Sequence, residues 1–348
     1  MIEDAVDTFL FKGEGLPDFD QFIPQRIEDE FPILLEKLNS DFNNIEIQFS
    51  SYLKSENLNW ENIMDPLNKI NEELRWSWGV VSHLNSVKNS EQLRDVYAKL
   101  LPKVINLGNK FGQSKVIYKA LKKLRNIDDL NIAKIRILDK EITEMEHSGI
   151  SLNESDQKIY NKTSERLGEL STIFSNNVLD STNKWFLILE NKSQVKGLPD
   201  RVLELMALSA QRHLQKEGKL EPQIGPWKLS LDIPTYTAFM SYSEDRDLRE
   251  KLYKAFVSRA SIDDKNNDQI IEEILTLRTQ QSKLLGYASW AELSLSTKMA
   301  NKINAVEKLL EELRIPSLEA AKIELDNLKN FAHQNGFNPN ERIKVWDI

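Results

Sequence analysis

The chain has 348 residues and a formal net charge of −8, from 54 acidic and 46 basic residues. This balance disfavours a nucleic-acid partner, because phosphate binding depends on a concentrated basic surface. The chain also has no cysteine, which excludes disulfides, thiolate metal sites and thiol nucleophiles and fits a reducing compartment.

Composition favours long, solvated helices. Charged residues make up 29% of the chain, and with only 12 Gly and 11 Pro there are few turn formers. The length suffices for about two domains or one large helical body. The basic run Lys119–Arg125 is interpreted as a solvated helix face and receives no function.

No segment predicts secretion or membrane insertion. The first 15 residues are acidic, whereas a signal peptide begins with a basic region. The longest clearly apolar run, Trp185–Leu189, is far too short to span a bilayer. We therefore expect a cytoplasmic protein with no membrane partner.

Apolar residues spaced three and four apart predict helices through the first half of the chain. The first begins at Pro24, and breaks are expected near Pro102 and over Gly108–Gly112. The other predicted helices are Trp60–His83, Ser90–Leu101, Lys115–Leu124, Ile132–Met145 and Glu154–Asp180.

A small β-ribbon is predicted next. Trp185–Glu190 is a short apolar run, and Trp227–Leu231 alternates apolar and polar residues with the period of a half-buried strand. We expect these two strands to pair, with a helix over Asp200–Gln215 in their connection. Pro234 ends the second strand and predicts a turn before a helix that begins at Asp245.

The last third of the chain is again predicted to be helical. Ile270–Leu285 ends at a glycine, Ala305–Leu313 is expected to break at Pro316, and a final helix covers Leu318–Ala332. No internal repeat, linker or domain boundary stands out. The predicted fold is mainly α, a multi-helix array with a small β-ribbon, treated as one region over residues 1–348.

The common catalytic and metal-binding motifs are absent from the sequence. The four histidines, His83, His147, His213 and His333, include no pair at the i and i+4 spacing of a zinc helix. Asp264–Asp268 copies the start of a calcium loop but lacks its Gly and its bidentate Glu, so it is interpreted as a polar helix start. No catalytic, cofactor-binding or metal-binding residue is assigned.

Several segments resemble, in the same order, the N-terminal half of the thimet-type zinc oligopeptidases of the oligopeptidase A branch. They are Leu16–Phe31, Trp60–Leu67, Val81–Leu93, Ser175–Thr182, Leu231–Tyr236, Leu248–Ala260, Leu285–Glu292, Leu295–Ala300 and Val345–Ile348. The resemblance implies a mostly helical, neurolysin-like fold that encloses a channel, and an enzyme that uses Zn²⁺ on an HExxH helix to cleave short cytoplasmic peptides. Because this chain contains no His-Glu pair, no zinc-binding or catalytic residue is carried over.

Two hypotheses follow. In the first, the chain is the truncated N-terminal, channel-forming part of such a metallopeptidase; its partners are short peptides and the missing C-terminal catalytic half, and it is inactive alone. In the second, it is a stand-alone helical module that binds peptides or a partner without hydrolysis. Whether the chain itself is an enzyme is left open. Under both hypotheses Tyr236, Tyr242 and Arg259 are held to be packing or channel-wall residues.

Overall fold

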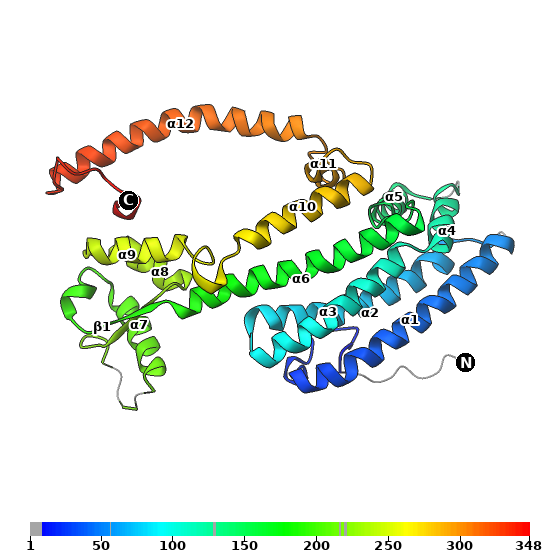
Figure 1. The fold of residues 1–348 in the computed structure, drawn as a ribbon, viewed down its shortest axis with the longest axis horizontal. Helices are drawn as coiled ribbons and strands as arrows, with labels where there is room; N and C mark the ends of the chain where they lie inside the picture. The colour runs from blue at the N-terminus through cyan, green and yellow to red at the C-terminus, as the bar shows by residue number, and fades with distance from the viewer. Residues whose placement is uncertain (1–8, 56, 128–129, 216, 219–220) are drawn as a thin grey trace. The chain divides into compact units, whose positions relative to one another are not determined.

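The computed structural model describes residues 9–55, 57–127, 130–215, 217–218 and 221–348 (Figure 1). These residues belong to two compact units, Met1–Ser171 with Ile274–Ile303, and Thr172–Glu273 with Asn304–Ile348. Residues 1–8, which contribute to the argument against a signal peptide, lie outside the described part. None of the helices in the described ranges combines the length and the apolar character needed to cross a membrane.

The first unit is an array of helices. A short 3-10 turn over Phe19–Gln21 precedes it. The helices are α1 (Pro24–Ser55), α2 (Trp60–Val87), α3 (Glu91–Gly112), α4 (Lys115–Arg125), α5 (Ile132–His147), the first part of α6 (Glu154–Lys184), the second part of α10 (Asp268–Leu284) and α11 (Trp290–Leu295).

Polar side chains fix where these helices begin. Asn59, Ser90, Ser114 and Asn131 each accept a hydrogen bond from a backbone N–H in the first turn of the helix that follows. Such caps satisfy donors that have no partner inside the helix. Just after the end of α5, Gly149 takes a left-handed φ of +84°.

One apolar core holds the first unit together. Helix α1 packs against α2, α3 and α4, and its fully buried side chains include Ile27, Phe31, Leu38 and Phe49. These positions follow the three- and four-residue spacing that predicts the helix, so the pattern identified the buried face correctly.

The second unit combines helices with a two-stranded sheet. Its elements are the end of α6, β1 (Phe186–Leu189), a 3-10 turn (Lys192–Val195), α7 (Asp200–His213), β2 (Trp227–Ser230), α8 (Ile233–Tyr242), α9 (Arg246–Val257), a 3-10 turn (Asp263–Lys265), the start of α10, α12 (Ile303–Gln334) and a last 3-10 turn (Val345–Asp347).

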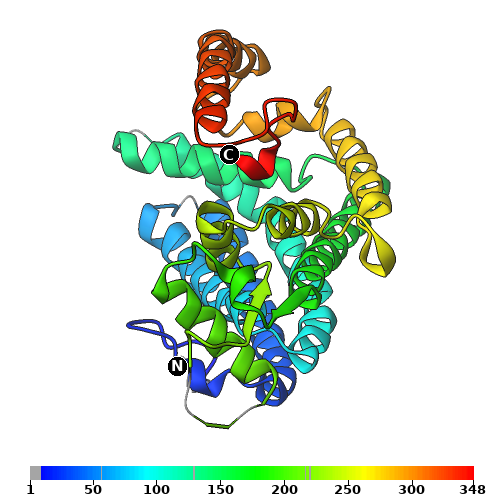
Figure 2. The ribbon, with the colours of Figure 1, turned by 90° about the vertical axis from the view of Figure 1, so that its left-hand side faces the viewer.

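The predicted β-ribbon is confirmed. Strands β1 and β2 pair antiparallel, with Leu187 opposite Leu229 and Leu189 opposite Trp227. Helix α7 lies against β2 (Figure 2). The indole of Trp227 is fully buried and donates a hydrogen bond to the carbonyl of Pro222 at 2.7 Å. The ribbon with its connecting helix thus forms the centre of this unit's core, and the mainly helical fold with a small ribbon is as expected.

The predicted helix breaks at Pro102 and Pro316 are wrong, because α3 and α12 run through these residues. Strand β2 ends before Pro234 as expected, but Pro234 lies in the first turn of α8 and not in a turn that leads to the helix after Asp245. A proline in the first helical turn loses no hydrogen bond, because that N–H has no partner in the helix. In α3, the buried Leu100 and Leu107 on either side of Pro102 offset its cost.

Helix α12 differs from the rest in having no buried residue. It nevertheless carries large apolar side chains that are between 39% and 65% exposed. They are Leu309, Leu310, Leu313, Ile315, Leu318, Ile323, Leu325, Leu328 and Phe331. We call these nine residues the α12 apolar surface.

Candidate functional site

The histidines do not form a metal site in the described residues. His83 lies beside Phe19, His213 packs on Phe186, and His333 is exposed in the last turn of α12. His147 is the most enclosed, with Nε2 2.9 Å from the Tyr287 hydroxyl and 3.3 Å from Ser296 Oγ. No group of three His, Asp or Glu side chains in the described part of the chain could hold a metal ion.

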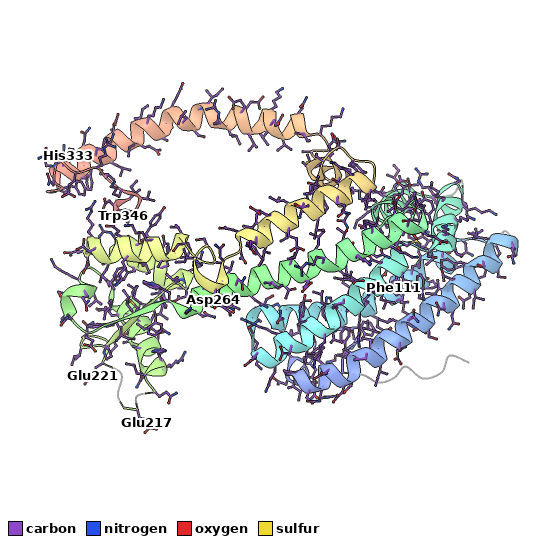
Figure 3. All side chains as sticks on the ribbon, in the orientation of Figure 1. Phe111, Glu217, Glu221, Asp264, His333 and Trp346 are labelled. Atoms are coloured by element: carbon purple, nitrogen blue, oxygen red, sulfur yellow. The ribbon has the colours of Figure 1, made fainter. Side chains whose placement is uncertain are left out.

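The calcium-like run forms a helix entry. Asn266 Oδ1 accepts a hydrogen bond from the Asp268 backbone N–H at 2.8 Å, and α10 begins at Asp268. Figure 3 labels Asp264 in this connection between α9 and α10. The Asn266 side chain thus satisfies a backbone donor at the start of α10, and the run leads directly into this helix.

A pocket of about 350 Å³ opens in the second unit, where the end of α6 meets the end of α9. Its wall includes the side chains of Trp185, Leu231 and Ile262, with Arg259 and two lysines among the polar groups. It is lined by Ser181, Lys184, Trp185, Leu231, Ala255, Ser258, Arg259, Ala260, Ile262, Asp264 and Lys265. An apolar cavity with a few cationic groups is typical of a small-ligand site.

The side chain of Arg259 is held in a fixed orientation at this pocket. Its guanidinium carbon lies 3.7 Å from the centre of the Phe256 ring, and its Nε donates a hydrogen bond to the Phe256 carbonyl at 2.8 Å. A longer hydrogen bond of 3.4 Å runs from Nη1 to Thr182 Oγ1. No carboxylate pairs with Arg259 among the side chains that the structure describes.

The other two cations have acidic neighbours. Lys265 Nζ lies 3.2 Å from Asp180 Oδ2, and Lys184 Nζ lies 3.7 Å from Asp264 Oδ1. Both members of the Lys184–Asp264 pair are 70% exposed, so this contact contributes little free energy. Arg259 is therefore the one lining cation of the described residues whose charge is not balanced nearby.

The turn after α9 is held in an unusual conformation. Ala260 has a left-handed φ of +52°, which costs a residue with a Cβ about 1 to 2 kcal/mol. The turn is fixed by hydrogen bonds of the buried Asn267, whose N–H donates to the Ala260 carbonyl at 2.8 Å and whose Oδ1 accepts from Asn177 at 2.8 Å. Backbone strain of this kind concentrates at functional sites.

Aromatic packing supports the wall of the pocket at Arg259. The ring of Tyr236 stacks on Phe256 with 3.9 Å between centroids, and burial is the first cause that raises the pKa of the Tyr236 phenol. Tyr242 is 54% exposed and does not line the pocket. Of the three residues held to be packing or wall residues, Tyr236 packs, Arg259 lines the pocket, and Tyr242 faces solvent.

The C-terminal residues form a second polar cluster, on α9. The last 3-10 turn, which contains Trp346 (Figure 3), packs on this helix, and Asp347 pairs with Arg246 and Arg249. The Arg249 Nε also donates to the Trp346 carbonyl at 2.8 Å. We call these four residues the C-terminal clasp.

Comparisons with known proteins agree with this architecture. The family profile "Neurolysin/Thimet oligopeptidase, N-terminal domain" matches residues 31–157, and the profile "Peptidase family M3" matches residues 239–348. Oligopeptidase A of Haemophilus influenzae is 37% identical over 347 residues, which are 97% of this chain and 48% of that protein. The chain is similar over nearly its whole length to oligopeptidase A, a thimet-type oligopeptidase. It corresponds to the N-terminal half of that protein.

Other relatives give the same result. Oligopeptidase A of Escherichia coli is 34% identical over 344 residues, with 96% of this chain and 48% of that protein covered. The probable cytosolic oligopeptidase A of Arabidopsis thaliana is 34% identical over 342 residues, with 97% of this chain and 47% of that protein covered. The chain spans about half the length of the curated relatives it matches.

The zinc ion implied by the family does not fit the described residues of this chain. A zinc site needs three or four His, Cys or carboxylate ligands converging within about 2.0 to 2.3 Å of one point. The chain has no cysteine, and no group of three or more His, Asp or Glu side chains in the described ranges could hold a metal ion. We therefore derive no reaction step through zinc for these residues.

Sequence reasoning missed the pocket but named the segments that build it. Ser181 belongs to Ser175–Thr182, Leu231 to Leu231–Tyr236, and Arg259 to Leu248–Ala260, all of which carry the family resemblance. Nothing in the sequence places these stretches side by side, because they are separated by tens of residues. The signal in the sequence was that these three family segments border short irregular turns. Binding residues often lie in such turns.

Proposed function

We propose that this chain is the N-terminal, channel-forming part of a zinc metallo-oligopeptidase that hydrolyses short peptides in the cytoplasm. The proposal is carried by the match of 97% of the chain to about half of Haemophilus influenzae oligopeptidase A. In this proposal the region that corresponds to the other half of the relatives supplies the zinc and its ligands. The chain alone is inactive. Its role is to form part of the channel wall and to select peptides by length.

The α12 apolar surface is the proposed contact with that other half. Its nine residues are between 39% and 65% exposed along a helix without a buried side chain. Apolar surfaces of this extent usually mark an interface. The occupant we propose is the C-terminal region, because the relatives are about twice as long as this chain.

Reconstitution tests both statements. The 348-residue chain is assayed with an internally quenched peptide, alone and joined to the remaining half of Haemophilus influenzae oligopeptidase A. We expect no hydrolysis by the chain alone and chelator-sensitive hydrolysis by the joined protein. Chelator-sensitive hydrolysis by the isolated chain would contradict the proposal, as would an inactive but folded joined protein.

Dye binding tests the docking surface separately. The isolated chain should bind an apolar fluorescent dye strongly, and the joined protein should bind much less. Replacing Leu313 and Leu325 with Lys should lower dye binding by the isolated chain and weaken association with a separately supplied C-terminal half. Low dye binding by the isolated chain would speak against an uncovered interface.

A stand-alone peptide-binding module remains the second candidate. The observation that favours it is the pocket at Arg259, which lies wholly within one unit of this chain. Peptide binding by the isolated chain, together with failure of the C-terminal half to associate with it, would support this function over the first.

A further inference from the structure

We propose that the pocket at Arg259 binds the C-terminal residue of a peptide, with the α-carboxylate on the Arg259 guanidinium and the apolar side chain against Trp185 and Leu231. The pocket itself is argued from its own geometry. Only the choice of a peptide, among carboxylates with an apolar body, rests on the proposed function.

The charge of the pocket favours an anionic ligand. Arg259 has no carboxylate partner among the described side chains, although the chain carries eight more acidic than basic residues. A guanidinium that is partly withdrawn from water is stabilised by a bidentate carboxylate, which accepts two parallel N–H hydrogen bonds. The Nη2 group of Arg259 makes no hydrogen bond to a described residue and is available for this contact.

The guanidinium is fixed before any ligand arrives. Stacking on Phe256 and the hydrogen bond from Nε to the Phe256 carbonyl determine its plane. Asn267 holds the Ala260 turn through the Ala260 carbonyl, and Asn177 holds Asn267. A cation with a fixed orientation loses little side-chain entropy on binding, so more of the ion-pair energy contributes to affinity.

The charged side chains of the pocket favour a ligand with one negative charge over a ligand with two. Lys265 and Lys184 already have Asp180 and Asp264 as neighbours, so only Arg259 lacks a balancing charge. A carboxylate supplies one negative charge, whereas a phosphate at neutral pH supplies up to two. The ligand that matches the described charges is therefore a monocarboxylate.

The size and polarity of the pocket favour a ligand with a short apolar part. A volume of about 350 Å³ is at the lower end of small-ligand pockets. The indole of Trp185 and the side chains of Leu231 and Ile262 offer an apolar wall next to the cation. The last residue or two of a peptide, with an apolar final side chain, fits this combination.

The test compares a peptide acid with its amide. Isothermal titration of the full 348-residue chain gives the affinities for acetyl-Ala-Leu and for acetyl-Ala-Leu-amide. The difference between them measures the contribution of the α-carboxylate to binding. We expect the acid to bind at least about tenfold more tightly than the amide, because an ionised partner roughly doubles the strength of a hydrogen bond. Equal affinities, or no binding of either peptide, would overturn the proposal.

Two matched pairs of variants assign the effect to the pocket. Arg259→Gln should abolish the difference between acid and amide, whereas Lys251→Gln, which removes the same charge from an exposed position of α9, should retain it. Ile262→Glu places a negative charge at the rim from a side chain that is 58% exposed, and should weaken binding of the acid. Val257→Glu, at a position that is 57% exposed and outside the pocket, should not. Loss of binding in both members of a pair, or in neither, would contradict the assignment.

Further ligands separate the possible sources of the carboxylate. Octanoate that binds more tightly than the peptide acid would overturn the choice of a peptide, and inorganic phosphate that displaces the peptide acid at equal concentration would overturn the choice of a monocarboxylate. The indole N–H signal of Trp185, assigned by its loss in Trp185→Phe, should shift with the acid and not with the amide. If the joined enzyme fails to hydrolyse peptides while the chain still distinguishes acid from amide, the proposed function fails and the pocket stands.

Discussion

The guanidinium of Arg246 donates two parallel hydrogen bonds to the carboxylate of Asp347, from Nε to Oδ1 at 2.8 Å and from Nη2 to Oδ2 at 2.9 Å. The Asp347 side chain is only 6% exposed, and its Oδ2 also accepts from the Lys344 backbone N–H. Burial alone would raise the pKa of Asp347, but these hydrogen bonds and the charges of Arg246 and Arg249 hold it below its usual value.

The first prediction concerns this clasp. Asp347→Asn removes the charge that Arg246 and Arg249 share, so the segment Val345–Ile348 should detach and exchange its amide hydrogens faster. Because the pKa of Asp347 is lowered in the folded chain, the clasp contributes stability above the ordinary Asp pKa of about 3.9 and loses it as the pH falls through the lower, folded-state value. Hydrogen exchange read by mass spectrometry checks both statements.

An exposed pair supplies the control for the clasp. Asp326 pairs with Lys329 on the surface of α12, where the Asp326 side chain is 72% exposed. Asp326→Asn should change the free energy of unfolding by less than about 0.5 kcal/mol and leave exchange in Val345–Ile348 unaltered. Unchanged exchange in Asp347→Asn would show that the clasp does not hold the C-terminal residues.

The second prediction concerns a buried charge in the first unit. Lys37 Nζ lies 2.9 Å from Glu73 Oε1, and the Glu73 side chain is 8% exposed. Lys37→Met leaves that carboxylate without its cation and should lower the free energy of unfolding by about 3 kcal/mol, measured by urea denaturation. The double variant Lys37→Met, Glu73→Leu should recover most of the loss, because the unpaired charge is gone.

Lys99 and Glu28 serve as the matched exposed pair. Their side chains are 64% and 40% exposed, so Lys99→Met should lower the free energy of unfolding far less than Lys37→Met does. A double variant of Lys37 and Glu73 that is as unstable as Lys37→Met would mean that the lost energy comes from packing and not from the unpaired carboxylate.

The third prediction is a pH dependence that involves His147. Burial is the main cause that lowers the pKa of this imidazole, opposed in part by the charges of Glu146 and Glu144. Since the unfolded chain then binds the proton more tightly, stability should be full above the ordinary His pKa of about 6.5 and should fall as the pH drops through this region. His147→Gln should flatten that slope in urea denaturation between about pH 7.5 and 5.5.

Tyr287→Phe separates burial from hydrogen bonding at this site. It removes the hydroxyl that lies 2.9 Å from His147 Nε2 and keeps the ring that covers the imidazole. If burial sets the pKa, the slope of stability against pH should persist in Tyr287→Phe. A flat slope in this variant would instead assign the effect to the hydroxyl.

The fourth prediction compares two glycines. A Cβ on Gly225 would lie 2.7 Å from the fully buried indole of Trp227, and the φ of Gly225 is +86°. Gly225→Ala should therefore lower the free energy of unfolding by about 3 kcal/mol. Gly79 lies inside α2 with nothing within 4 Å of its added Cβ, so Gly79→Ala should raise the same free energy by up to about 1 kcal/mol. Thermal unfolding of both variants checks the contrast.

The parts of the fold that depend on local pattern were predictable. The spacing of Ile27, Phe31 and Leu38 predicts α1 and its buried face, and alternation in Trp227–Leu231 predicts the strand that pairs with β1. These signals are local because a helix or strand face repeats every 3.6 or 2 residues.

The errors occurred where packing or position overrides a local rule. Pro102 was expected to end a helix, but the buried side chains on both sides of it keep α3 continuous. The pocket could not be predicted, because it depends on Asn177 reaching Asn267, which is 90 residues away in the chain. Arg259 was interpreted as a packing or channel-wall residue because the chain lacks the zinc-binding half. That no carboxylate of the described residues pairs with it is visible only in three dimensions.

The division of the chain between the two units has a consequence for synthesis. The first unit is closed by Ile274–Ile303, which the ribosome makes only after Thr172–Glu273 of the second unit. The second unit likewise receives Asn304–Ile348 last, including Asp347 of the clasp. The buried cores lie within the earlier segments, from Leu10 to Ile150 and from Leu189 to Leu252, so each core can close during synthesis and the late segments dock on it afterwards.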